Sequence, residues 1–287
     1  MLDCHKQKGA DVTIAAIPVP MEEASRFGVV ITDEYDRITE FEEKPPQPRS
    51  NLASMGIYIF SWPVLRESLI ALKDQNNCDF GKHIIPYLHE KNSPMYAYEF
   101  NSYWKDVGTL GSYWEANMEL IDLIPEFNLY EEFWKIYTNQ EIIEPQFVSD
   151  GSVVEKAIIG AGAQIYGEVY NSVLGAGVVI DEGTVVRDSI IMTGAHIGKN
   201  CTVDRGIIAE NCEIGDNTLI GVGESAESEL NASVYAFDLA VIGENSIIPS
   251  NVKIGKNTAV KGVTESDDYP EGELVSGGYI IKAGDQS

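Results

Sequence analysis

Basic residues are scarce in this 287-residue chain. Its 20 Lys and Arg stand against 45 Asp and Glu, which gives a formal net charge of −25 at pH 7. So acidic a chain repels the phosphates of nucleic acids and the surface of anionic membranes, so we expect neither as a partner. A small phosphorylated ligand is not excluded, because such a ligand needs only a few local cations.

Cysteine and long apolar runs are also scarce. The four cysteines form no Cys-x-x-Cys pair and no other metal-ligand spacing: Cys4, Cys78, Cys201 and Cys212. A reduced, cytoplasmic protein is therefore the simpler interpretation. No apolar run is long enough to span a bilayer, and no signal-peptide core follows Met1. The four histidines are scattered, and none lies in a triad-like context.

A six-residue repeat of aliphatic side chains fills residues 153–260. Its members are Ile159, Ile165, Leu174, Ile180, Val186, Ile191, Ile197, Val203, Ile208, Ile214, Ile220, Ile242, Ile248, Ile254 and Val260. This period fits a short strand plus a turn, repeated on three flat walls with the aliphatic residue pointing inward. Gly or Asn should supply the left-handed backbone of each corner. We therefore predict a left-handed parallel β-helix of hexapeptide repeats over residues 148–287.

Strands and helices alternate in residues 1–147, which favours an α/β domain with a partial, Rossmann-like sheet. Strands are expected at residues 12–19, 26–32, 37–43, 52–60 and 95–100, and helices at 1–9, 63–72, 80–90 and 110–123. The aromatic-rich residues 128–140 are expected to dock the two halves. The repeat is interrupted at residues 222–240, whose acidic run we interpret as a solvated excursion loop.

Two neighbouring charged residues lie at the end of a predicted strand, an edge where open α/β sheets bind ligands. Lys44 supplies a point charge suited to a phosphate, and Glu43 can accept hydrogen bonds from sugar hydroxyls. The plainer alternative is a solvated charge pair before a Pro-Pro turn.

Three further positions are candidates, each with a plainer alternative. Gly28 would let the backbone approach a sugar ring, or it is a β-bulge residue. Ser54 would bond a sugar hydroxyl, or it is an ordinary strand serine. Asp106 suits Mg²⁺, which binds through one or two carboxylates plus phosphate oxygens, or it is a helix-capping or turn residue.

Four stretches of the first half, taken in order, resemble sugar-nucleotide pyrophosphorylases. They are Arg26-Phe-Gly28-Val-Val30, Phe41-Glu-Glu43-Lys44-Pro45, Ala53-Ser54-Met-Gly56-Ile-Tyr58 and Tyr103-Trp-Lys105-Asp106-Val-Gly108-Thr109. Joined to a hexapeptide β-helix, they closely resemble the bacterial glucose-1-phosphate adenylyltransferases. The resemblance implies conversion of ATP and glucose 1-phosphate to ADP-glucose and diphosphate in glycogen synthesis.

The same resemblance implies roles for particular residues. It assigns Gly28, Glu43, Lys44 and Ser54 to the glucose 1-phosphate site, and Asp106 to Mg²⁺. Lys44 and Asp106 would be the catalytic pair. It also implies a homotetramer and allosteric control by sugar phosphates or nucleotides. Separately, we expect the β-helices to associate, because an open end of the coil leaves strand edges and apolar surface to cover.

Two features of that family are not found in these residues. The family opens with a glycine-rich, basic loop around the ATP phosphates and has a later Gly-Asp metal ligand. We therefore expect an N-terminally truncated chain that keeps the sugar-phosphate half of the site and is impaired in turnover. Two alternatives stay open. One is a non-catalytic regulatory or oligomerisation subunit. The other is a hexapeptide acyltransferase with His196 as base, although an exposed wall or corner histidine is the plainer interpretation.

Overall fold

The computed structural model describes residues 1–133, 135, 137 and 142–282. The chain divides into two compact units, Met1–Ser102 and Tyr103–Ser287. Of the aromatic-rich segment at 128–140, residues 134, 136 and 138–140 lie outside the described residues. Among the described residues, no helix has the length and apolar character that crossing a membrane requires.

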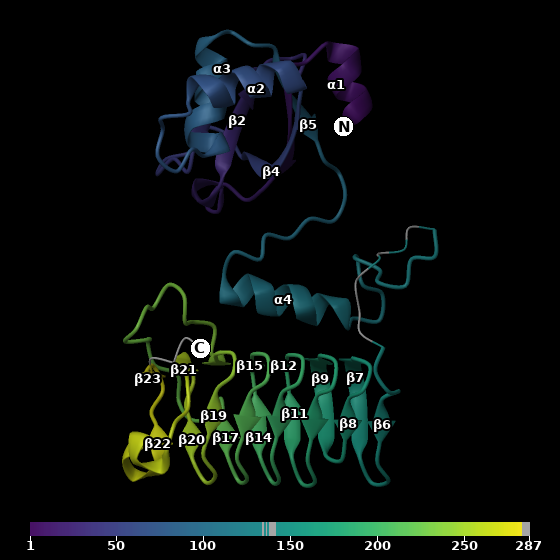
Figure 1. Cartoon of the computed structure of the whole chain (residues 1–287), viewed down its shortest axis with the longest axis vertical. Coiled ribbons are helices and arrows are strands. Elements are labelled where there is room, and N and C mark those ends of the chain that lie inside the picture. The colour runs from purple at the N-terminus through teal and green to yellow at the C-terminus, as the bar shows by residue number, and fades with distance from the viewer. Residues whose placement is uncertain (134, 136, 138–141, 283–287) are drawn as a thin grey trace. The chain divides into compact units, whose positions relative to one another are not determined.

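The first unit is a five-stranded sheet in the order β3-β2-β4-β1-β5 (Figure 1). Its strands are β1 (Val12–Pro18), β2 (Gly28–Thr32), β3 (Ile38–Glu43), β4 (Leu52–Phe60) and β5 (Met95–Glu99). Only β1 and β5 pair in parallel, whereas β1–β4, β2–β3 and β2–β4 are antiparallel. The α/β class is confirmed, but its sheet is more mixed than the Rossmann-like term suggests.

Helices cover this sheet at positions close to those expected. They are α1 (Leu2–Lys8), α2 (Trp62–Ala71), a π-helical turn (Phe80–Ile84) and α3 (Ile85–Glu90). Gly9 ends α1 in the left-handed conformation, with φ 56°. Five successive residues of β1 are buried, because this strand has neighbours on both sides and packing on both faces. The core unites β1, β2, α3 and β5 around Ile14, Ile85 and Met95.

The second unit is a parallel β-helix. One six-stranded sheet contains β6 (Phe147–Val148), β8 (Gln164–Ile165), β10 (Val179–Ile180), β13 (His196–Ile197), β16 (Glu213–Ile214) and β19 (Ile247–Ile248). A twelve-stranded sheet bends into the other two walls. It contains β7 (Val153–Ile159), β9 (Glu168–Leu174), β11 (Val185–Arg187), β12 (Ile190–Ile191), β14 (Thr202–Asp204), β15 (Gly206–Ile208), β17 (Leu219–Ile220), β18 (Ala240–Ile242), β20 (Lys253–Ile254), β21 (Thr258–Lys261), β22 (Glu273–Leu274) and β23 (Tyr279–Ile281). Figure 1 shows the strands stacked in sequence order, from teal to yellow.

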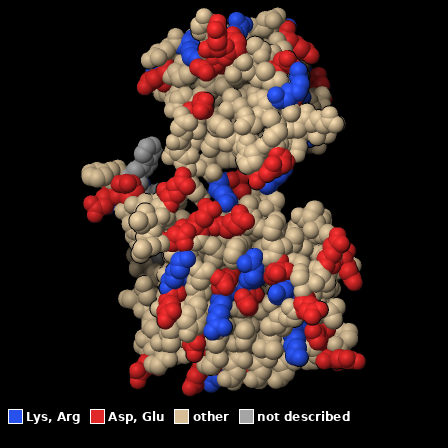
Figure 2. Space-filling model, turned by 180° about the vertical axis from the view of Figure 1, so that it is seen from behind, with Lys and Arg blue, Asp and Glu red and all other residues tan. Residues whose placement is uncertain are grey.

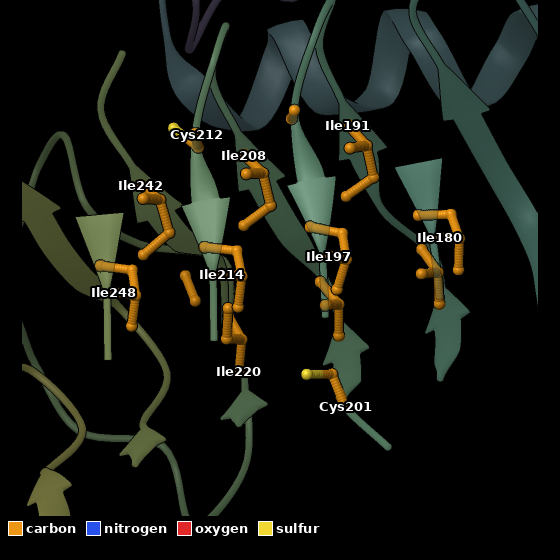
Figure 3. Packing of buried hydrophobic residues seen from close by; sticks show 14 of the residues in the cluster. Ile180, Ile191, Ile197, Cys201, Ile208, Cys212, Ile214, Ile220, Ile242 and Ile248 are labelled. Atoms are coloured by element: carbon orange, nitrogen blue, oxygen red, sulfur yellow. The ribbon is translucent and has the colours of Figure 1, made fainter. Parts of the chain in front are cut away.

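The hexad residues form the main core of this coil. Every member from Ile165 to Val260 is buried in one cluster, and Ile159 packs against it at the first coil. Figure 3 shows several of them between the walls, with Ile180, Ile197, Ile214 and Ile248 following one another along the coil. The prediction of a β-helix built from hexapeptide repeats is thus confirmed, and it is consistent with the left-handed class.

The corners use the predicted residue types. Asn200, Asn211 and Asn217 have φ between 54° and 56° in the left-handed region. Cys201 and Cys212 are buried, and their thiols donate to backbone carbonyls of the next coil at 3.2 and 3.1 Å. Burial raises the pKa of both thiols, which suits a packing role rather than a reactive one.

Helix α4 (Leu110–Leu120) belongs to the same unit as the β-helix. Its Leu110, Tyr113 and Met118 pack on a small core of the coil that contains Ile190 and Ile207. The unit boundary therefore precedes the domain boundary expected at residue 147.

On the surface of the coil, Figure 2 shows basic side chains interspersed with acidic ones.

Candidate functional site

The carboxylate of Glu43 lies between two glycines from different elements. A Cβ atom built on Gly28 would lie 2.9 Å from Glu43 Oε2 and 2.7 Å from Phe41 Cζ, and one built on Gly81 would collide with the same carboxylate. Gly28 pairs with Glu43 in regular register, and the shift in this hairpin occurs at Ile31 instead. Gly28 is therefore not a β-bulge residue. It is required because side chains of β3 occupy the space of its missing Cβ.

Glu43 shares its surroundings with charges of both signs. Burial raises its pKa, and the nearby carboxylate of Asp79 raises it further. Lys44 and Lys82 oppose the rise without cancelling it. The charges of Asp79, Lys44 and Lys82 thus all act on the Glu43 carboxylate at the end of β3.

Lys44 follows the last residue of β3 in a left-handed backbone conformation, with φ 47°. This conformation is uncommon for a residue that is neither Gly nor Asn, and the following Pro45 restricts the backbone further. The Lys44 amide donates to the carbonyl oxygen of Phe27 at 3.1 Å, which holds the strained corner. The side chain is exposed, and within the described part of the chain its ammonium makes no salt bridge.

Ser54 joins this group through an irregularity in β4. Ser54 pairs with Ala16 and Tyr58 pairs with Ile14, so two extra residues bulge out between them at Gly56, whose φ is 70°. The bulge places the Ser54 and Tyr58 side chains on one face. Burial and the nearby charges of Glu43 and Asp79 raise the pKa of Tyr58, although the neighbouring Ser54 hydroxyl lowers it.

The turn that carries Asp79 was expected only to begin a helix. Asp79 does cap it, because its carboxylate accepts from the Lys82 amide at 2.8 Å. The turn is π-helical over Phe80–Ile84, and it brings Gly81 and Lys82 beside Glu43. The Phe80 ring stacks on Tyr58 at 5.6 Å between centroids and closes one side of the cluster.

Asp106 lies in the second unit, Tyr103–Ser287. It belongs to the extended segment before α4 and is half-buried. A Cβ built on Gly108 would lie 3.2 Å from both of its carboxylate oxygens, so the glycine leaves open the space beside the carboxylate. The N-cap of α4 is Thr109, which accepts from the Ser112 amide at 3.1 Å, so Asp106 is not the capping residue.

The residues that the structure describes offer a metal ion few grouped ligands. Over the described ranges, no three His, Cys, Asp or Glu side chains are grouped to hold a metal ion. A single carboxylate such as Asp106 still fits Mg²⁺, which keeps several waters and binds phosphates as well. Asp106 therefore offers one carboxylate to a metal ion whose other ligands are waters and phosphate oxygens.

His196 lies on the β13 wall between carboxylates of two neighbouring coils. Its Nε2 is 2.9 Å from Asp181 Oδ2, and its Nδ1 is 3.1 Å from Glu213 Oε2. Partial burial lowers its pKa, but the Asp181 hydrogen bond and both acidic charges outweigh burial and raise it overall. Both ring nitrogens face acceptors, an arrangement that favours the charged imidazolium rather than a free general base.

Comparison with protein families gives two matches along the chain. A sequence model described as nucleotidyl transferase matches residues 1–122, and one described as the GlmU-like C-terminal hexapeptide matches residues 144–236. Proteins of the nucleotidyl transferase class generally use a divalent metal ion.

Curated relatives match nearly the whole chain. A glucose-1-phosphate adenylyltransferase of Lachnospira eligens is 64% identical over 285 residues, which are 99% of this chain and 67% of the relative. Those of Acetivibrio thermocellus and Thermosipho africanus are 44% and 50% identical, over 99% and 98% of this chain and 67% of each relative. The chain thus spans about two thirds of the length of these relatives.

Proposed function

This chain belongs to the glucose-1-phosphate adenylyltransferase family, and we propose that the cluster around Glu43 is its glucose 1-phosphate site. The proposal is supported by the mixed set of charges that the fold gathers at the end of β3. Hydroxyl groups of a sugar need acceptors, which Glu43 and Asp79 provide, and its phosphate needs a cation, which Lys44 provides.

The backbone strain at Lys44 supports the same assignment. A left-handed lysine costs about 1–2 kcal/mol relative to a relaxed residue, and glycine or asparagine would avoid most of that cost. A lysine side chain kept at this corner in spite of the strain is consistent with a role in ligand binding. Gly28 and Gly81 leave room for the Glu43 carboxylate, and Ser54 and Tyr58 add hydroxyl groups on one face of β4.

The family reaction is an in-line displacement in which a phosphate oxygen of glucose 1-phosphate attacks the α-phosphorus of ATP and diphosphate leaves. Lys44 binds the sugar phosphate and holds its attacking oxygen in place. Glu43 and Asp79 orient the sugar ring by accepting hydrogen bonds from its hydroxyl groups. Asp106 would hold Mg²⁺, which neutralises charge on the phosphates when bound.

Binding of glucose 1-phosphate by calorimetry tests the site. Lys44→Ala should weaken the affinity about 10- to 100-fold, because one charge-assisted hydrogen bond contributes about 1.5–3 kcal/mol. Lys44→Gly should weaken it equally while making the fold more stable, since glycine relieves the left-handed strain. Lys73→Ala, which removes an exposed lysine at the end of α2, is the matched control.

Two results would contradict this role. One is an unchanged affinity in both Lys44 variants. The other is an equal loss for free glucose, which has no phosphate for Lys44 to bind. An assay of ADP-glucose formation from ATP separates binding from turnover. Binding without turnover would favour the regulatory-subunit alternative.

We also propose that copies of the chain associate through the β-helix. Its end strands carry exposed apolar side chains, Phe147 at one end and Tyr279 and Ile281 at the other. Open strand edges of this kind favour pairing with another chain. Light scattering across a concentration series tests the association, and a monomer at every concentration would refute it.

A further inference from the structure

One column of β-helix corners departs from the pattern of the others. Asn171, Asp188 and Arg205 occupy equivalent corners of three successive coils, all with left-handed backbones at φ 45°, 46° and 48°. Most other corners of this kind use Gly or Asn. An arginine there costs about 1 kcal/mol or more in backbone strain, which the contacts of its side chain must offset.

The Arg205 guanidinium lies over helix α4. Its carbon is 4.2 Å from the centroid of the Trp114 ring, a cation–π contact. Its Nε and Nη2 both donate to the carbonyl oxygen of Phe237, at 3.2 and 2.7 Å. The Trp114 indole in turn donates to the carbonyl oxygen of Asp188 at 2.6 Å. The corner thus contacts both α4 and the segment at Phe237.

Phe237 belongs to the loop that interrupts the repeat, and its ring presses on the start of α4. A Cβ built on Gly111 would lie within 2.6 Å of two atoms of that ring, so only glycine admits this contact. The loop is fixed to the coil by Asn257, which accepts from the Asp238 amide and donates to the Ala226 carbonyl oxygen, both at 2.8 Å. The interpretation of this segment as a merely solvated loop is therefore incomplete.

The residues around Asp106 are tied to α4 in the same way. Lys105 forms salt bridges with Glu119 at 2.8 Å and Glu115 at 3.2 Å, and the Tyr103 hydroxyl donates to Glu119 at 3.0 Å. Partial burial lowers the pKa of Lys105, but these acids raise it overall. On the other side of Asp106, Thr109 caps α4. The position of Asp106 therefore follows the position of α4.

We propose that Arg205 is a positioning residue that clamps α4 between the β-helix corner and the excursion loop, and so fixes the Asp106 segment. The coil then acts as the rigid support of one carboxylate of the reaction. The relevance to catalysis depends on the function proposed for Asp106, whereas the mechanical coupling does not.

Hydrogen exchange on the full chain tests the coupling directly. Arg205→Asn is the informative variant, because asparagine suits the corner backbone while it removes the clamp. We expect amides of residues 103–112 to exchange about tenfold faster, with coil amides unchanged and thermal stability equal or higher. Arg205→Lys keeps the cation near Trp114 but loses the planar fork, and should restore part of the protection.

Arg187→Asn is the matched control, since Arg187 lies over Tyr170 at 5.1 Å in a cation–π contact that does not involve α4. Unchanged exchange at 103–112 in Arg205→Asn would overturn the proposal, as would an equal effect of Arg187→Asn. A Mn²⁺ titration followed by electron paramagnetic resonance gives the second readout, and we expect weaker binding in Arg205→Asn than in the parent. If the parent binds no Mn²⁺, the role of Asp106 fails while the exchange result still decides the clamp.

Discussion

The β-helix and the Glu43 cluster solve the same backbone problem in different ways. In the coil, left-handed corners recur at Asn200, Asn211 and Asn217, where the residue type suits the conformation. At the end of β3 the conformation is equally left-handed, but Lys44 occupies it. Most corners of the coil therefore relieve strain with Asn or Gly, whereas the end of β3 keeps a strained lysine, whose side chain we propose as the phosphate ligand.

The largest effect should come from the coil core. Ile248 is 1% exposed and its neighbour Ile247 is 44% exposed on the same short strand. Ile248→Ala should lower the free energy of unfolding by about 2–5 kcal/mol, because it removes buried methyl groups and leaves a cavity. Ile247→Ala should change it by about 0.5 kcal/mol or less. Denaturant unfolding followed by circular dichroism measures both.

An equal loss of unfolding free energy in Ile248→Ala and Ile247→Ala would contradict the expected difference between the buried and the exposed position. It would mean that Ile247 is covered in solution, for instance by a second copy of the chain, since its surface is open in the single chain. Repeating the measurement at low protein concentration separates that case. A cost for Ile247→Ala that disappears on dilution would assign the residue to an interface.

The coil could be predicted almost completely from sequence because each of its requirements is local and repeated. The inward positions of the hexads and the Asn or Gly corners follow from a single period. The period could not predict what the residues that depart from it contact. Arg205 and Phe237 are unremarkable in sequence, and their contacts with α4 depend on a segment about 90 residues or more away.

The proposed site could be predicted only in part, because its residues come from separate segments that follow no repeat. Gly28, Glu43, Lys44 and Ser54 lie in short motifs, and the fold gathers them around one cluster. Asp79, Gly81 and Lys82, which we include in the proposed site, could not be predicted, because a π-helical turn cannot be told from an ordinary helix start by its periodicity. A Gly two residues after a capping Asp, at the first turn of a helix, was the only signal.

An effect of intermediate size is expected from replacing a glycine. One kind of glycine leaves space for neighbouring side chains, and the other supplies a left-handed backbone. Gly28 has no positive φ but has Phe41 and Glu43 atoms where its Cβ would be, whereas Gly177 has φ 66° and open space. Gly28→Ala should cost about 1–3 kcal/mol in stability and weaken glucose 1-phosphate binding, because it displaces Glu43. Gly177→Asn should cost about 0.5 kcal/mol or less, since asparagine serves other corners.

Thermal unfolding and calorimetric binding on both variants measure this difference. If Gly177→Asn is the more damaging change, its corner demands more than a left-handed backbone. If Gly28→Ala loses stability but binds glucose 1-phosphate normally, the glycine serves packing alone and Glu43 is not a ligand of the sugar.

The smallest effect should come from pH, through His196. Its folded-state pKa is raised, so its contribution to stability is present below the unfolded-state value of about 6.5 and is lost as pH rises through the folded value. The side chain is 39% exposed, so solvent screening limits the contribution to about 1 kcal/mol or less. His196→Gln should therefore be less stable than the parent at about pH 6 and equal to it at about pH 9.

Asp181 and Glu213 face this histidine from adjacent coils, so the pH effect reports on contacts between coils rather than on the repeat itself. Added salt should reduce the difference between the two proteins at low pH, because the pairs are partly exposed. A stability difference that grows toward high pH would reverse the sign and show that the imidazole stabilises the wall as a neutral group. In that case burial, which opposes the two carboxylates, would be the stronger influence on His196.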